Sequence, residues 1–211
     1  MLTVHHLGVS QSDRIVWLCE ELGIPYELKL YQRDPGLAPA AYKALTPYGT
    51  APAITDGDLS LGESGAIIEY IIAKYGEGRL AVAADQPNFT DYLFWFHFAN
   101  GTMMAALMTD LVIRLTTGAA PPEGASFITD RIDRAYEIVE ERLGKAPFFA
   151  GEAFTAADIM MLFPLTSMRM FNPRDFTPYP HLRAYLGKIA ERPAFVAAMA
   201  KAEPGKPIQL I

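Results

Sequence analysis

The chain has 211 residues, of which 51% are hydrophobic and 20% are charged, and these values are typical of a globular protein that buries a sizeable core. Its formal net charge of −6 at pH 7 argues against nucleic acid or an anionic membrane as the main partner. The single cysteine excludes an intramolecular disulfide framework, and no apolar run approaches the roughly 18 to 20 residues of a membrane span, so we expect a cytoplasmic protein that is not inserted in a membrane.

The first third of the chain mixes strand and helix patterns. Alternating residues predict strands over 2–7 and 26–30, and an apolar periodicity between them predicts a helix over 15–22 that ends at Gly23. A hairpin and a further helix follow. This order of elements is the one that a small α/β domain needs.

Three residues of these elements have side chains that can support chemistry. His5 and His6 are neighbours on the first strand, so their side chains point to opposite faces and cannot hold a metal together. We expect one of them to be buried and the other exposed. Cys19 stands in the middle of the helix pattern, which predicts a core cysteine rather than a reactive thiol.

Two serines stand in the loop between the first strand and the first helix. Hydroxyl groups at such a position meet the positive end of the helix dipole. Ser12 comes directly before Asp13 and the apolar pattern, so it is predicted to be the N-cap of the helix. From the residues alone, a capping role is open for Ser10 as well.

Residues 52–62 predict a tight antiparallel hairpin. Asp56–Gly57 lies between two apolar stretches and is expected to form the two-residue loop, because such turns need positive φ at their central residues. Pro52 cannot donate to a sheet ladder, so it is expected at the start or edge of the first strand, with a cis peptide bond after Ala51. The backbone of Ala51 is then left for a ligand.

A helix pattern begins directly after the hairpin. Glu63 and Ser64 precede the apolar run 66–72, so Ser64 is predicted to be the N-cap of a helix whose first amides point outward. Such a helix end favours a carboxylate. Together with the hairpin, this segment predicts a small-anion site built from backbone groups.

The second part of the chain is all helical. Periodicity is lost over 78–87, which we interpret as a linker between a domain at 1–77 and a domain at 88–211. Thr155 and Asp158 form the pattern of a capping box. The tail from Pro204 to Ile211 has no helical pattern and is expected to be extended. Helices are predicted over 88–117, 126–143, 155–170, 181–191 and 194–201.

Three separated segments, residues 2–14, 46–64 and 151–158, resemble the cytosolic glutathione transferase superfamily. They follow one another along nearly the whole chain, and the first resembles the serine-type active site of bacterial, theta-like and delta-like members. The resemblance implies an α/β thioredoxin-like N-terminal domain plus an all-α C-terminal domain. It also implies a cytoplasmic homodimer that acts in detoxification, with glutathione as co-substrate and neither a metal nor a redox cofactor.

The resemblance assigns a role near the first helix. Theta-like and delta-like transferases share a Ser-x-x-x-Arg spacing in which the serine is catalytic, and counting back from Arg14 gives Ser10, with Ser12 as the alternative. The implied role is a hydrogen bond donated to the glutathione thiol, because a free thiol has a pKa near about 8.5 and is mostly protonated at pH 7. Ser10 would polarise the thiol without acting as a nucleophile.

The other implied glutathione contacts come from three places. Ala51 and Pro52 would present their backbone to the cysteinyl unit, while Glu63 and Ser64 would hold the γ-glutamyl group. Asn100 stands where the neighbouring subunit of similar proteins approaches the γ-glutamyl amine, and a polar helix surface residue is its alternative.

The glycyl end and the acceptor pocket are less directly implied. Thr50 stands where many relatives have a lysine or glutamine that reaches the glycyl end, so Arg33 or another side chain is expected to anchor it. Met103 and Met104 are candidates for an apolar acceptor pocket, although most methionines in such helices serve as adaptable core filler.

The predicted function is attack of the activated glutathione thiol on small apolar electrophiles or hydroperoxides. The crowding of apolar and aromatic side chains over 92–98 supports the implied homodimer, because it exceeds what one buried stripe needs. A non-catalytic glutathione-fold module for interaction or regulation is an alternative, and so is a specialised glutathione-dependent isomerase or dehalogenase. The sequence leaves these alternatives open.

Overall fold

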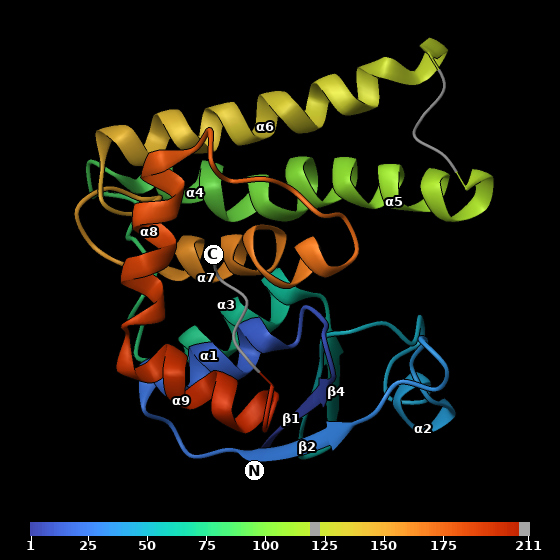
Figure 1. Ribbon diagram of the computed structural model, residues 1–211. Coiled ribbons are helices and arrows are strands. Elements are labelled where there is room, and N and C mark those ends of the chain that lie inside the picture. Colours follow the sequence, from blue (N-terminus) through green and yellow to red (C-terminus); the bar gives the residue numbers. More distant parts are fainter. Residues whose placement is uncertain (119–122, 207–211) are drawn as a thin grey trace. The chain divides into compact units, whose positions relative to one another are not determined.

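The computed structural model describes residues 1–118 and 123–206. The described residues form two compact units, the first made of residues 1–81 with the C-terminal segment from residue 189, the second of residues 82–188 (Figure 1). The first unit combines strands and helices and the second is helical, as the sequence predicts.

The first unit contains a mixed sheet. Strand β1 pairs in parallel with β2 and antiparallel with β3, so the sheet order is β2-β1-β3-β4. Helix α1 connects the two parallel strands, which need such a crossover, and α1 and α3 pack on the sheet. The elements are β1 (Leu2–Leu7), α1 (Asp13–Leu22), β2 (Glu27–Tyr31), α2 (Ala40–Lys43), β3 (Ala53–Asp56), β4 (Leu59–Gly62), α3 (Ser64–Lys74) and α9 (Pro193–Ala202).

The register of the sheet decides which loops meet. His5 in β1 lies opposite Ala53 in β3, and Ala53 lies opposite Gly62 in β4. Because neighbouring strands here run antiparallel, the loop after β1, the residues before β3 and the residues after β4 lie at one end of the sheet.

Both histidines of β1 are buried, with exposed fractions of 4% for His5 and 1% for His6. The prediction of one exposed histidine is wrong because β1 is an inner strand. Helix α1 packs on the sheet, while Tyr42 of α2 packs against Leu7 and donates a hydrogen bond to the His5 carbonyl. Side-chain alternation therefore sends the two imidazoles into two different buried environments.

The hairpin between β3 and β4 has its loop one residue later than predicted. Asp56 pairs with Leu59, which leaves Gly57–Asp58 as the loop, and Gly57 has a φ of 61°. Asp56 stays in the strand because its carboxylate accepts hydrogen bonds from Tyr70 at 2.7 Å and Lys74 at 2.8 Å. These bonds tie the hairpin to α3.

Helix α1 ends where the sequence predicts. Gly23 has a φ of 62°, and its N–H group donates to the carbonyls of Cys19 and Glu20, which closes the helix with a left-handed glycine. Cys19 is fully buried, so the predicted core cysteine is confirmed, and burial raises the pKa of its thiol.

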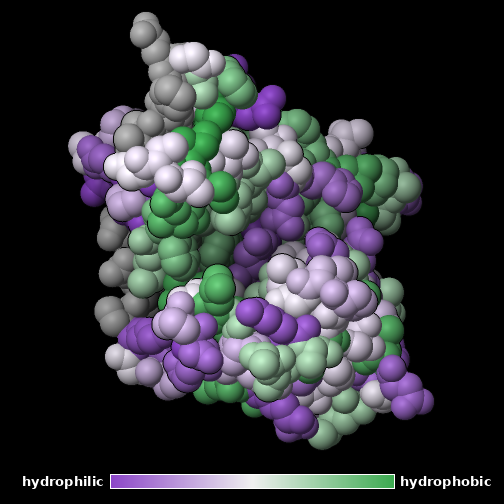
Figure 2. Space-filling model, turned by 90° about the vertical axis from the view of Figure 1, so that its right-hand side faces the viewer, coloured by the Kyte–Doolittle hydropathy of each residue, from purple (hydrophilic) through white to green (hydrophobic). Residues whose placement is uncertain are grey.

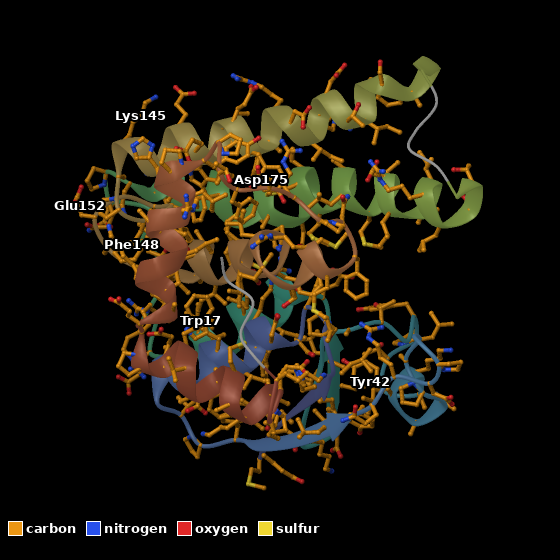
Figure 3. All side chains as sticks on the ribbon, in the orientation of Figure 1. Trp17, Tyr42, Lys145, Phe148, Glu152 and Asp175 are labelled. Atoms are coloured by element: carbon orange, nitrogen blue, oxygen red, sulfur yellow. The ribbon has the colours of Figure 1, made fainter. Side chains whose placement is uncertain are left out.

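The last helix, α9, packs along α1 and belongs to the first unit. Trp17, which is labelled in Figure 3, meets Phe195 edge to face, with 5.1 Å between the ring centroids. Arg192 pairs with Glu21 at 2.8 Å. The sequence assigned this helix to the domain over 88–211. Its apolar periodicity shows that one face is buried but carries no information on which neighbour covers that face.

The helices of the second unit largely follow the predicted ranges. The pattern over 155–170 is interrupted at Thr166, where φ is −125° and ψ is −93°. Pro164 lacks the N–H group that would continue the helical hydrogen bonds. The elements are α4 (Phe89–Phe98), the π-helix η1 (Ala99–Met104), α5 (Ala105–Thr117), the 3-10 turn η2 (Glu123–Ala125), α6 (Ser126–Lys145), α7 (Ala156–Leu165), the 3-10 turn η3 (Ser167–Met170) and α8 (Pro180–Ala190).

The predicted capping box of α7 is confirmed. Thr155 Oγ1 accepts a hydrogen bond from the amide of Ala157 at 3.3 Å, and Asp158 Oδ2 accepts one from the amide of Thr155 at 2.9 Å. The other carboxylate oxygen, Oδ1, accepts from the amide of Phe149 at 3.0 Å and from the hydroxyl of Tyr185 at 3.1 Å. Asp158 therefore joins three segments of the second unit.

The C-terminal tail differs from expectation in its described part. Instead of running extended, residues 203–206 form a turn in which the amide of Lys206 donates to the carbonyl of Glu203 at 3.1 Å. Residues 207–211 lie outside the described residues. Over residues 1–118 and 123–206, no helix is both long and apolar enough to cross a membrane.

Candidate active site

The segments predicted to bind a ligand meet at one end of the sheet in the first unit. They are the loop after β1, residues 50–52 before β3, and residues 63–64 at the start of α3. The peptide bond between Ala51 and Pro52 is cis, as expected. Pro52 is buried, Ala51 is half-buried and Thr50 is exposed.

The backbone at this end is held in unusual conformations. Val9 has a φ of 50° and Glu63 a φ of 69°, a region that costs a non-glycine residue about 1–3 kcal/mol and persists only when the surroundings enforce it. Val9 is held on both sides, because its amide donates to Glu203 and its carbonyl accepts from Arg33 at 2.7 Å. The loop that carries Ser10 is thus fixed from outside.

Ser64 does not play the capping role that the sequence predicts. Glu63 occupies the N-cap position, and Ser64 is the first residue of α3. The Ser64 hydroxyl accepts a hydrogen bond from Arg14 Nη1 at 3.2 Å and donates one to Gln11 Oε1 at 3.4 Å. It therefore links the N-termini of α1 and α3.

The electrostatics of this helix start suit a carboxylate. Burial lowers the pKa of Arg14 to about 10, against the opposing charge of Asp13, so the guanidinium beside Ser64 remains charged at neutral pH. The first hydrogen bond of α3 runs from the amide of Ile67 to the carbonyl of Glu63. The amides before it lie at the positive end of the helix dipole, where an anion is favoured.

Ser12 occupies the N-cap position of α1 but makes no capping hydrogen bond with its side chain. Its hydroxyl instead lies 2.7 Å from Ser10 Oγ and 2.9 Å from His6 Nδ1, and it accepts from the amide of Leu7 at 3.1 Å. The predicted N-cap position of Ser12 is therefore confirmed, but the predicted capping hydrogen bond of its side chain is wrong. Ser12 has turned inward because a buried imidazole and a buried amide offer it partners there.

His6 is held in turn by a residue near the opposite end of the chain. Its Nε2 atom lies 3.2 Å from Glu203 Oε1. Burial raises the pKa of Glu203, but hydrogen bonds from His6, Lys206 and the amide of Val9 outweigh it and lower the pKa to about 2. Glu203 is therefore ionised at neutral pH. We call Ser10, Ser12, His6 and Glu203 the His6 chain.

Arg33 supports the loop rather than pointing away from it. Its guanidinium donates to the carbonyl of Gly8 at 2.8 Å, to that of Val9 at 2.7 Å and to that of Gly36 at 2.9 Å. These bonds hold the two residues that precede Ser10. The expected contact between Arg33 and a glycyl carboxylate stays a prediction.

The remaining candidates belong to the second unit. Asn100, Met103 and Met104 lie in the π-helix η1 between α4 and α5, and single π-helical turns are frequent at functional sites. Both methionines are buried, as core filler would be. A cavity of about 110 Å³ in this unit is lined by other residues, Asp110 and Tyr136 among them, so the acceptor-pocket role of the methionines stays a prediction.

The sequence did not reveal the buried contacts of His6 and Glu203 behind the two serines. His6 could not be ranked above His5, because alternation on a strand says only that the two differ. Glu203 is separated from His6 by 197 residues, and no local pattern connects them. Among the residues that the structure describes, no group of three or more His, Cys, Asp or Glu side chains is placed to hold a metal.

Comparisons with known proteins agree with this architecture. The glutathione S-transferase N-terminal domain matches residues 5–79, and the glutathione S-transferase C-terminal domain matches residues 122–188. Glutathione S-transferase 3 of Schizosaccharomyces pombe is 32% identical over 218 residues, which cover 96% of this chain and 88% of that protein.

Solved structures are similar over nearly the whole chain. A glutathione S-transferase from Actinobacillus pleuropneumoniae is 33% identical, with a TM-score of 0.87 over 96% of this chain and 93% of that chain. A glutathione transferase from Phanerochaete chrysosporium, crystallised with oxidised glutathione, is 22% identical, with a TM-score of 0.77 over 95% of this chain and 96% of that chain, and shows the fold alone.

These relatives confirm the predicted fold class, an α/β N-terminal half followed by a helical half, and the predicted glutathione transferase enzyme. Both halves of the chain match in the same order, and the 32% identity extends over almost all of it. The chain belongs to the glutathione S-transferase family.

Proposed function

We propose that this glutathione transferase uses a serine-type active site, in which Ser10 polarises the thiol of glutathione for attack on small apolar electrophiles or hydroperoxides. The observation that carries the proposal is the convergence of the Ser10 loop, the Ala51–Pro52 segment and the Glu63–Ser64 helix start at one end of the sheet. Detoxification is the physiological role that fits such an activity.

Ser10 has the position that thiol activation needs. Its hydroxyl is buried at the N-terminus of α1, where the helix dipole favours a thiolate over a thiol. One hydrogen bond together with this helix end lowers the pKa of the thiol by about two units, which corresponds to roughly 2.7 kcal/mol. Ser12, whose hydroxyl is engaged with His6, is the less suitable of the two serines.

The rest of glutathione has matching groups in the same region. The γ-glutamyl carboxylate fits the start of α3, where Ser64 and the charged Arg14 meet. The backbone of Ala51 serves the cysteinyl unit. For the glycyl end we retain Thr50 and Arg33, and for the γ-glutamyl amine we retain Asn100 from a second subunit.

A homodimer is part of the proposal. Leu93 and Phe94 of α4 are exposed by 38% and 52%, and Phe127 of α6 by 63%. On the face shown in Figure 2, hydrophobic residues form patches between hydrophilic ones. A contiguous exposed apolar patch favours a protein partner, and we assign Leu93, Phe94 and Phe127 to the dimer because of their exposure. A dimeric mass by light scattering at micromolar concentration is expected, whereas a monomer would remove the cross-subunit role of Asn100.

We also propose a cytoplasmic location, in keeping with the unpaired cysteine.

Calorimetry with glutathione, followed by a panel of aryl halides, epoxides and organic hydroperoxides, tests the proposed function. We expect a dissociation constant in the micromolar to millimolar range and turnover with at least one of these classes. Binding without turnover on any of them would favour the interaction module. Activity confined to an isomerisation or a dehalogenation would favour the specialised enzyme.

A further inference from the structure

The His6 chain has a hydrogen-bond direction that can be worked out from donors and acceptors. The ionised carboxylate of Glu203 only accepts, so His6 Nε2 carries a hydrogen and donates across the 3.2 Å contact. In a neutral imidazole the other nitrogen, Nδ1, is then an acceptor. The protonation state of His6 therefore decides to which atom the hydroxyl of Ser12 donates.

When His6 is neutral, each group of the His6 chain donates its hydrogen in the direction of Glu203. Ser12 donates to His6 Nδ1 at 2.9 Å, and its oxygen accepts from the Leu7 amide at 3.1 Å and from Ser10 at 2.7 Å. Ser10 Oγ also accepts from the Ser12 amide at 3.3 Å. A hydroxyl oxygen has two acceptor positions, so Ser10 keeps one for an incoming S–H group.

When His6 carries a second proton, the hydrogen bonds from His6 Nδ1 to Ser10 reverse and run in the direction of the ligand. His6 Nδ1 and the Leu7 amide then fill both acceptor positions of Ser12, and the Ser12 hydroxyl donates to Ser10 at 2.7 Å, since its alternative acceptor, the carbonyl of Leu7, is farther away at 3.4 Å. Ser10 is left with a hydrogen for the ligand. Both directions leave each buried atom with a partner.

We propose that His6 is the terminal acceptor of the glutathione proton, with Ser10 and Ser12 as a two-hydroxyl relay and Glu203 as the residue that holds the imidazole. This inference rests on the proposed function, because it needs the thiol to meet Ser10. It makes His6, Ser12 and Glu203 positioning residues, since of the four only Ser10 touches the substrate.

The transfer of the thiol proton is balanced within the His6 chain. The S–H bond breaks as a new O–H bond forms on Ser10, the former hydrogen of Ser10 moves to Ser12, and the former hydrogen of Ser12 moves to His6 Nδ1. The products are a thiolate that accepts a hydrogen bond from Ser10 and an imidazolium that faces the carboxylate of Glu203. No external base is required, and the proton stays in the protein.

The charges around His6 favour this outcome. Glu203, at the end of α9, faces the imidazole directly and is itself held by Lys206 from the following turn. Arg33, which follows β2, holds the carbonyls of the same loop. The carboxylate of Glu203 lies 3.2 Å from His6 Nε2, so it offers an imidazolium at His6 a compensating charge.

His5 provides an internal comparison one residue away. Its Nδ1 lies 3.0 Å from the hydroxyl of Tyr31 and its Nε2 lies 3.0 Å from that of Thr55. Burial, with the charge of Lys29, lowers the pKa of His5, which keeps the imidazole neutral. The described contacts of His5 include neither a carboxylate nor a hydroxyl of the Ser10 loop, so it is a buried histidine without a route to the thiol.

The wild-type protein allows a direct test with ¹⁵N-labelled histidine. At neutral pH, the His6 ring should show a neutral imidazole with hydrogen on Nε2, and saturating glutathione should convert it to an imidazolium. S-methylglutathione, which has no thiol proton, should leave His6 neutral. His5 should stay neutral in both complexes.

Proton counting gives a second readout on the same sample. Calorimetry in buffers with different ionisation enthalpies reports the protons released, and the ultraviolet absorbance of the thiolate reports how much thiol has ionised. The relay predicts abundant thiolate with a proton release close to zero. One proton released per thiolate, with His6 neutral, would overturn the relay while leaving the proposed function intact, whereas absence of binding or of thiolate would overturn the proposed function itself.

Two variants separate the relay from a structural role of His6. His6→Asn should reduce the thiolate fraction of bound glutathione about tenfold at neutral pH, and Glu203→Gln should reduce it in the same direction. The matched variant His5→Asn should leave the fraction unchanged. Equal losses in His5→Asn and His6→Asn would overturn the proposal.

Discussion

Two buried polar clusters, one in each unit, show how differently a carboxylate can be used. In the second unit, Asp158 accepts hydrogen bonds from two backbone amides and from Tyr185. In the first unit, Glu203 meets His6, which leads through Ser12 to Ser10. The first carboxylate ends a set of fixed donors, and the second ends a chain of groups that can exchange hydrogens.

The two carboxylates differ in burial, since Asp158 is fully buried and the Glu203 side chain is 18% exposed, and they differ in their donors. A backbone amide can only donate, so the two amide bonds to Asp158 have one possible direction, and they hold α7 and its neighbouring segments in place. Hydroxyl and imidazole groups both donate and accept, so the His6 chain has two directions. The pKa values differ as well: burial raises that of Asp158 to about 6, while hydrogen bonds lower that of Glu203 to about 2.

The largest effect on stability is expected for Asp158→Ala. This change leaves the buried amides of Phe149 and Thr155 without their acceptor and removes the hydrogen bond from Tyr185, so the free energy of unfolding should fall by about 3 kcal/mol or more. The matched change is Asp175→Ala, since Asp175 is exposed, and it should cost less than about 1 kcal/mol. Urea unfolding measures both, and similar losses would contradict the role given to Asp158.

A smaller loss is expected for Ser12→Ala. The buried amide of Leu7 and His6 Nδ1 each lose a partner, which should lower the free energy of unfolding by about 1–3 kcal/mol. Ser60→Ala is the matched control, because Ser60 is exposed and donates only to a carbonyl, and its effect should stay within about 0.5 kcal/mol. If the two variants unfold at the same urea concentration, the inward position of Ser12 is wrong.

A comparable effect, on binding rather than folding, is expected for Ser64→Ala. Loss of the hydroxyl between Arg14 and Gln11 should weaken glutathione by about 1 kcal/mol, roughly fivefold, as measured by calorimetry. Cysteinylglycine, which lacks the γ-glutamyl group, should bind more weakly and respond little to the variant. A dissociation constant for glutathione that changes by less than about twofold would contradict the placement of the γ-glutamyl carboxylate.

The effect of Glu203→Gln on stability should depend on pH, and this dependence should lie in the acid range. The folded-state pKa of Glu203, about 2, is below its ordinary value of 4.5, so its contribution is present above about pH 4.5 and is lost as the pH falls towards 2. Wild type should exceed Glu203→Gln in stability at neutral pH, and the gap should narrow on acidification. A gap that is constant from pH 7 to about pH 3 would contradict an ionised Glu203 in the folded protein.

The sequence predicts the loops and helix starts of the site better than the pairing of His6 with Glu203. Local signals identified the Ala51–Pro52 segment, the start of α3 and the loop with Ser10, because turns, prolines and caps depend on near neighbours. Errors of one residue at Ser64 and at the hairpin loop have the same local origin, since several side chains compete for each boundary.

Contacts between distant residues could not be predicted in this way. The pairing of His6 with Glu203 depends on α9 packing along α1, and a helical periodicity does not name its partner. The inward turn of Ser12 depends in turn on that imidazole. Tertiary contacts therefore overrode a good local reason for Ser12 to cap its own helix.

An ultraviolet titration of bound glutathione shows whether Ser10 activates the thiol. In Ser10→Ala the titration of the thiol should move to higher pH by one unit or more, which corresponds to about 1.4 kcal/mol and about a tenfold loss of turnover at neutral pH, with glutathione affinity nearly unchanged. Wild type and Ser60→Ala should titrate together at lower pH. An unshifted curve for Ser10→Ala would show that Ser10 does not activate the thiol and would return the catalytic role to Ser12.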